Sequence, residues 1–163
     1  MNKDAIRTWA IRWLYAVFAA HLILGLLLPW FANAALFDAY HRAIGTAFWG
    51  QAAPADVLAT SKAQQVWWIS LFGPTVQYLA ICMAGLTSIG ALYRNSAVWA
   101  WLLGGLILWA PQDMFISLRM ACWPNVWIDC LALASLLPPL FWLWRNDRVP
   151  CEMHTMFLKE TTR

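Results

Sequence analysis

Residues 109–129 read WAPQDMFISLRMACWPNVWID, and this stretch joins two long apolar segments in the second half of the chain. It predicts a hairpin of two helices, because each flanking segment is close to the ~20 residues needed to cross a hydrocarbon core of ~30 Å. The stretch also holds most of the polar residues at membrane depth. They are Gln112, Asp113, Ser117 and Arg119 on the arriving segment, next to Pro111, and Asn125 and Asp129 on the departing one, next to Pro124.

The composition of the whole chain indicates a membrane protein. Of its 163 residues, 62% are hydrophobic and 12% are charged, whereas about 25% of residues are charged in ordinary soluble domains. The net charge of +3 is scattered, with no run of Lys or Arg, which argues against nucleic-acid binding. We expect a membrane domain over residues 1–148 and a cytoplasmic tail over 149–163.

Four apolar segments predict an all-α fold, an antiparallel bundle of four transmembrane helices. The spans are about 8–31, 66–92, 97–118 and 124–144. Ala32, Asn33 and Ala34 resemble a signal-peptide cleavage site, but the apolar run before them exceeds the ~7–15 residues of a signal peptide. We therefore expect that segment to be retained as the first span. Gly73 and Pro74 predict a bend in the second span.

The first outer loop, 34–65, is the only long segment that is not continuously apolar. Within 35–49, apolar residues recur at helical spacing with Asp38, His41 and Arg42 on other faces, which predicts a short helix in the membrane interface. Residues 50–65 contain Pro54 and several small polar residues, and we predict that they form a loop.

The positive charges predict the orientation. With four spans both termini lie on one side, which holds all Lys and Arg residues except Arg42, Lys62 and Arg119. The positive-inside rule therefore places both termini in the cytoplasm. The tryptophans are assigned to aromatic belts at the two interfaces, with Trp99 in the cytoplasmic belt.

Counting along the hairpin predicts a cluster of polar residues. If the chain turns at Ala121, Asp113 faces Asp129 and Ser117 faces Asn125. At 1.5 Å per residue, His21 of the first span and Gln77 of the second reach a similar depth. The candidate ligand-binding or proton-handling residues are Asp113, Asp129, Arg119, His21, Gln77, Gln112, Ser117 and Asn125. Intramembrane carboxylates usually have partners. Helix packing through interhelical hydrogen bonds is the alternative interpretation of the same residues.

The chain lacks the common signatures of catalysis and metal binding. No Cys/His spacing matches a zinc or haem site, and no P-loop, GxSxG or HExxH pattern is present, so the sequence predicts no metal and favours a non-enzymatic protein. The cysteines are interpreted as small buried hydrophobes. A disulfide between Cys122 and Cys130 is left open, because their spacing does not ensure bonding distance.

The layout resembles that of small bacterial inner-membrane proteins of the DoxX-like type. The resemblance covers the four spans and the long first outer loop, and its best part is residues 109–140. It is carried by Asp113 followed by Ile116, Ser117 and Leu118, then a turn and Asn125. Asp129 and Cys130 are outside the resemblance. The resemblance implies a location in a bacterial inner membrane and, from some DoxX-like proteins, an association with redox chemistry.

Three classes of function fit these observations. The leading prediction is a non-enzymatic protein that binds a lipid, a hydrophobic small molecule or a partner's transmembrane helices through the outer-half polar crevice, as an accessory subunit or a homo-oligomer. The first alternative is a quinone-linked oxidoreductase component with Asp113, Asp129 or His21 as proton donor. The further alternative is a proton-coupled carrier or a toxin-immunity protein.

Overall fold

The computed structural model describes residues 2–52 and 54–147, and all of the regular structure within these ranges is helical. In the described ranges, four helices are long and apolar enough to cross a membrane, so the chain is a multi-pass membrane protein. The predicted tail, 149–163, lies outside the described residues. In chain order the elements are α1 (Lys3–Phe31), the 3-10 turn η1 (Ala35–Phe37), α2 (Asp38–Trp49), α3 (Ala55–Tyr93), α4 (Ser96–Arg119) and α5 (Trp123–Asn146).

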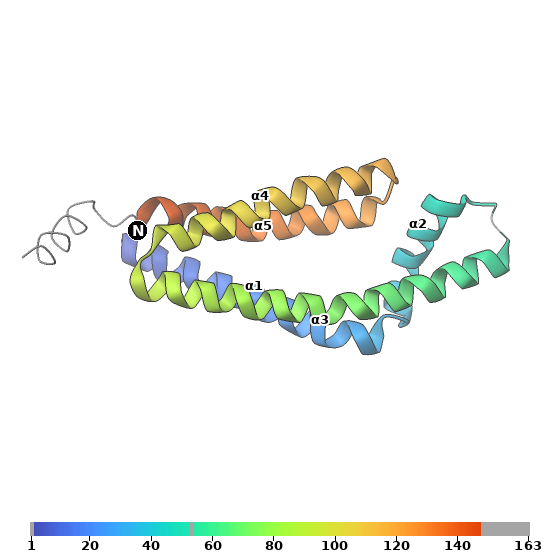
Figure 1. Cartoon of the computed structure of the whole chain (residues 1–163), viewed down its shortest axis with the longest axis horizontal. Helices are drawn as coiled ribbons and strands as arrows, with labels where there is room; N and C mark the ends of the chain where they lie inside the picture. Colours follow the sequence, from blue (N-terminus) through green and yellow to red (C-terminus); the bar gives the residue numbers. More distant parts are fainter. Residues whose placement is uncertain (1, 53, 148–163) are drawn as a thin grey trace, which may run out of the picture.

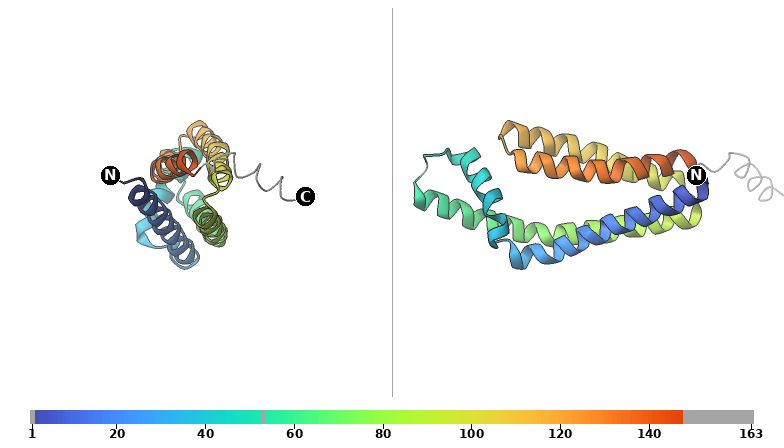
Figure 2. Two further views of the ribbon diagram at one scale, coloured as in Figure 1. Left: turned by 90° about the vertical axis from the view of Figure 1, so that its left-hand side faces the viewer. Right: turned by 180° about the vertical axis from the view of Figure 1, so that it is seen from behind.

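The four long helices form two pairs. α1 packs along α3 and α4 packs along α5, and the two helices of each pair run in opposite directions (Figure 1). The pairs meet at the end of the molecule that holds the N-terminus and lie apart at the other end, as both side views show (Figures 1 and 2). We call these ends the terminal end and the distal end.

The hydrophobic core lies at the terminal end. Trp99 is its largest member and is 0% exposed, so its assignment to an interfacial belt is wrong. The reason is Gly90 of α3, where an added Cβ would lie 2.7 Å from the Trp99 ring, so the indole packs against bare α3 backbone instead of lipid. The other buried members are Ala10, Leu14, Phe18, Val98, Leu102, Leu103, Leu106, Leu136, Leu140 and Leu143.

Two glycines bring α1 and α3 into close contact further along the pair. A Cβ added at Gly25 would lie 2.8 Å from the carbonyl oxygen of Gly73, and one added at Gly73 would lie 2.6 Å from the Pro29 ring. Small residues at a helix crossing let the two backbones approach in this way. The Gln77 side chain adds a hydrogen bond of 2.9 Å to the carbonyl oxygen of Gly25.

α3 begins well before the predicted span, and the predicted loop over 50–65 is wrong for most of its length. Residues 55–65 form the first three turns of a helix of 39 residues. Pro54 occupies the N-cap position and Asp56 lies in the first turn, where a negative charge favours a helix N-terminus. The helix continues through Gly73 and Pro74 and curves gently over its whole length (Figure 1).

Short turns connect the remaining helices. α2 ends at Gly50, whose positive φ of 78° is readily adopted by a residue without Cβ. Between α4 and α5, Ala121 has a φ of 53°, and the Cys122 N–H donates to the carbonyl oxygen of Ser117 at 2.8 Å. The α4–α5 hairpin therefore turns at Ala121, as predicted.

Candidate functional site

Four polar side chains of α4 and α5 lie together towards the distal end, and we call them the distal polar cluster: Asp113, Ser117, Asn125 and Asp129. The Asn125 amide donates to Ser117 Oγ at 2.7 Å and to Asp113 Oδ1 at 3.2 Å. One helical turn separates the two members on each helix, so both pairs face the same seam between α4 and α5.

Asp129 is the buried member of the distal polar cluster. It is 2% exposed, and its Oδ2 atom has no hydrogen-bond partner in the described part of the chain. The Asp113 carboxylate lies close enough to repel it. Since an ionised carboxylate without a partner is costly to bury, this arrangement calls for a proton or for a hydrogen-bond donor from outside the described residues.

Tyr40 of α2 lies in the neighbourhood of the same cluster. Burial raises the pKa of its phenol, and the Cys122, Asp113 and Asp129 side chains raise the pKa further. The hydroxyl therefore keeps its proton at neutral pH.

A groove follows one face of α4 next to Asp113. Positions 98, 102, 105, 109, 112 and 116 recur every three or four residues and so share one face of the helix. Val98 and Leu102 are buried on that face, whereas Trp109 and Ile116 are 43% and 61% exposed. The open part is a cavity of about 430 Å³, which we call the α4 groove, lined by Gly105, Leu108, Trp109, Gln112, Asp113 and Ile116.

The other predicted site residues do not hydrogen-bond to the distal polar cluster. His21 Nδ1 lies 2.7 Å from the carbonyl oxygen of Val17 on its own helix, and Gln77 bonds to α1. The Gln112 amide donates to the carbonyl oxygen of Leu108 at 2.6 Å. Arg119 is exposed and lies over the Phe115 ring at 5.7 Å, so it does not cover the carboxylates. The proposed eight-residue site is therefore a cluster of four, with Gln112 lining the adjoining groove.

A second polar cluster, at the terminal end, was missed by the sequence analysis. Arg7 Nε donates to Asp147 Oδ1 at 2.8 Å, while its terminal NH2 group donates to Asp147 Oδ2 at 3.0 Å and to the carbonyl oxygen of Ala91 at 2.8 Å. The Trp99 indole donates to Asp147 Oδ2 at 3.1 Å. We call Arg7, Ala91, Trp99 and Asp147 the terminal clamp.

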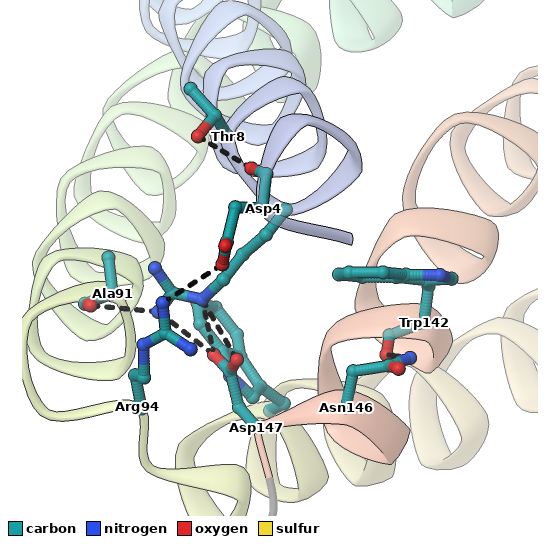
Figure 3. Close-up of polar contacts among 9 residues, drawn as sticks. Asp4, Thr8, Ala91, Arg94, Trp142, Asn146 and Asp147 are labelled. Atoms are coloured by element: carbon teal, nitrogen blue, oxygen red, sulfur yellow. Dashed lines mark hydrogen bonds and ion pairs between the residues drawn. The ribbon is translucent and has the colours of Figure 1, made fainter. Parts of the chain in front are cut away.

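The terminal clamp draws on all four long helices. Arg7 comes from α1, Ala91 from α3, Trp99 from α4, and Asp147 directly follows α5. Figure 3 shows Asp147 at the centre of these contacts, with the exposed ion pair between Arg94 and Asp4, at 3.3 Å, beside it. In the sequence, Arg7 and Asp147 carry opposite charges and lie at the ends of the first and last spans that share one side of the membrane. They are 140 positions apart, so the sequence alone does not show that they pair.

The cysteines and metal-binding residue types add no further site. Cys82, Cys122 and Cys130 are free thiols, so the disulfide left open between Cys122 and Cys130 is not formed. Cys151 lies outside the described residues. Within residues 2–52 and 54–147, no group of three or more His, Cys, Asp or Glu side chains is placed to hold a metal ion.

In comparisons with known proteins, no family model, no curated protein and no solved structure matches this chain.

Proposed function

We propose that this chain is a non-enzymatic inner-membrane protein that binds a small hydrophobic molecule in the α4 groove. One observation carries the proposal. The face of α4 that is buried at Val98 and Leu102 lies open from Gly105 to Ile116, with the Asp113 carboxylate at its edge. A cavity of about 430 Å³ is within the ~300–1,000 Å³ range of small-molecule sites.

The polar atoms of the α4 groove indicate the chemistry of the ligand. Gln112 uses its amide N–H on the carbonyl oxygen of Leu108, which leaves its side-chain oxygen as an acceptor. Asp113 accepts from Asn125 through Oδ1, so Oδ2 is left as a second acceptor. A ligand that pairs with these atoms must donate hydrogen bonds. The proposed ligand is therefore an apolar molecule with a hydroxyl, amide or cationic group.

In the same proposal, the four long helices form an antiparallel bundle in a bacterial inner membrane, with both termini cytoplasmic and α2 in the outer interface. The distribution of Lys and Arg supports this orientation, and the DoxX-like resemblance implies the same setting. Single cysteines at Gln51 and Lys3, in a chain whose native cysteines are replaced by serine, test it. Labelling of intact cells by an impermeant maleimide is expected at position 51 and not at position 3.

A groove-filling variant tests the ligand site. Gly105 lines the α4 groove, and a Cβ added there meets no side chain and no backbone of another element within 4 Å, so Gly105→Leu adds a side chain to open space in the groove. Gly104 has the same free space but does not line the groove, and Gly104→Leu is the matched control. Mass spectrometry of organic extracts should find a molecule that co-purifies with the wild type and with Gly104→Leu but is depleted from Gly105→Leu.

The same extracts decide between the proposal and its alternatives. Equal retention of every extracted molecule by the two leucine variants would contradict the α4 groove as the site. A quinone depleted only from Gly105→Leu would favour the quinone-linked component. A polypeptide that co-purifies with the wild type and is lost from Gly105→Leu would instead identify the groove as a contact for a partner's transmembrane helix.

A further inference from the structure

A second cavity lies at the distal end, between α2 and the first turns of α3. Its volume is about 460 Å³, and we call it the α2–α3 cavity. It shares no lining residue with the α4 groove or the distal polar cluster. Its polar lining consists of Asp38, His41, Arg42, Thr46 and Lys62, with Leu58 among the apolar residues.

The charges in the α2–α3 cavity leave a positive excess. Lys62 Nζ donates to Asp38 Oδ1 at 2.8 Å. This hydrogen bond, followed by the charge of Lys62, lowers the pKa of Asp38, so Asp38 is ionised at neutral pH and balances one cation. Lys62 keeps two further N–H donors. The charge of Arg42 also lowers the pKa of Asp38. Arg42 makes no ion pair within the described ranges, so its guanidinium N–H groups are available to an anion.

His41 holds the walls of this cavity in place. Its side chain is 4% exposed, and Nε2 lies 2.9 Å from the carbonyl oxygen of Ala32, beyond the end of α1. Nδ1 lies 3.1 Å from Gln65 Oε1 on α3, and Gln65 in turn bonds to Ser61. α2 is thus fixed to its neighbours on both sides, and the cavity is formed before any ligand binds.

The position along α3 places the cavity at the level of lipid headgroups. Trp67 and Trp68 of α3 are 55% and 58% exposed, and exposed tryptophans mark the membrane interface. Lys62 precedes Trp67 by five residues, about 8 Å along a helix. The headgroup layer extends about 5–8 Å beyond the hydrocarbon core on each side. Lys62 and the neighbouring Arg42 therefore lie at the height of the lipid phosphates.

We propose that the α2–α3 cavity binds a phosphate ester. The Arg42 guanidinium and the free donors of Lys62 contact the phosphate oxygens, and the Thr46 hydroxyl donates a further hydrogen bond. Charge-assisted hydrogen bonds from Arg and Lys are the usual means of holding phosphate in proteins. A lipid headgroup and a soluble phosphate ester share this chemistry, and the depth of the cavity together with Leu58 in its wall favours the headgroup.

Thermal unfolding of the detergent-purified full chain, followed by tryptophan fluorescence, tests this site. The probes are phosphatidylglycerol, glycerol 3-phosphate and uncharged diacylglycerol. We expect phosphatidylglycerol to raise the Tm of the wild type and diacylglycerol to leave it unchanged. The concentration of phosphatidylglycerol needed for half of the shift should rise about tenfold in Arg42→Gln, since one charge-assisted contact is lost.

Arg119→Gln is the matched control, because Arg119 is an exposed arginine at the same end of the molecule that does not line the cavity. Arg42→Gln should keep the Tm of the wild type without ligand, which shows that it folds. An equal loss of affinity in both variants would mean unspecific attraction to anionic lipid and would overturn the site, as would no response to either phosphate probe. A response to phosphatidylglycerol alone supports the lipid headgroup, and an equal response to glycerol 3-phosphate supports the soluble ester.

Discussion

Asp147 at the terminal end and Asp129 towards the distal end are buried to almost the same extent, 3% and 2% exposed. Asp147 accepts hydrogen bonds from Arg7 and Trp99, whereas Asp129 Oδ2 has no partner in the part of the chain that the structure describes. Burial alone therefore does not show whether a carboxylate has its hydrogen-bond partners within the protein. The difference lies in whether the protein itself supplies the counter-charge.

The number of helices packed around the two carboxylates also differs. The terminal clamp joins all four long helices next to the hydrophobic core. The distal polar cluster joins only α4 and α5, at the end where the two helix pairs lie apart (Figure 1). We infer that the terminal end provides the stability of the bundle and that the distal end provides its binding surface.

Asp147→Asn should have the largest effect. It removes the negative charge that faces Arg7, whose side chain is only 15% exposed, and an uncompensated buried charge costs about 3 kcal/mol of unfolding free energy. Denaturation in mixed micelles, followed by tryptophan fluorescence, measures the loss. The control is Asp4→Asn, which breaks the exposed pair with Arg94 and should cost less than about 1 kcal/mol. Equal losses in the two variants would refute a structural role for the terminal clamp.

Gly90→Ala should have an intermediate effect at the same end. Its Cβ would lie 2.7 Å from the fully buried Trp99 ring, and overpacking of this kind costs about 1–3 kcal/mol. The same denaturation measurement applies, with Gly85→Ala as control, because a Cβ at Gly85 meets no atom within 4 Å. Since alanine favours a helix over glycine, the control should be neutral or slightly stabilising; a similar loss in both variants would argue against the tight contact with Trp99.

Asp129→Asn should have the smallest effect on stability. No charge partner is lost, and replacing the carboxyl by an amide leaves the number of buried polar groups unchanged. We expect a change within about 1 kcal/mol in unfolding free energy, against the much larger loss for Asp147→Asn. A loss as large as that of Asp147→Asn would show that Asp129 is also a structural residue.

The sequence predicted the parts of the fold that depend on local chemistry. Four apolar runs of membrane length identified the four long helices, because hydropathy and length suffice for that inference. The contact between Ser117 and Asn125 followed from counting equal distances on either side of Ala121, since a short turn fixes which residues of two antiparallel helices face each other.

The remaining features depend on contacts between distant segments. Residues 55–65 are polar enough to resemble a loop, and their helix is stabilised by packing against α2, which includes the His41–Gln65 hydrogen bond. Trp99 was predicted to lie at the interface because tryptophan usually prefers that position. In the structure it is buried, because Gly90 has no side chain and leaves room for the indole ring. Arg7 and Asp147 are paired only because the first and last long helices meet at the terminal end.

The unbroken length of α3 makes the protein sensitive to the thickness of its membrane. Its 39 residues extend about 58 Å at 1.5 Å per residue, and the predicted span 66–92 alone extends about 40 Å, more than the ~30 Å of a hydrocarbon core. We expect a thicker bilayer to be matched by a smaller tilt of α3 and a thinner one by a larger tilt. The height of Lys62 relative to the lipid phosphates changes with that tilt, and bilayers of different thickness therefore present the α2–α3 cavity to their headgroups at different levels.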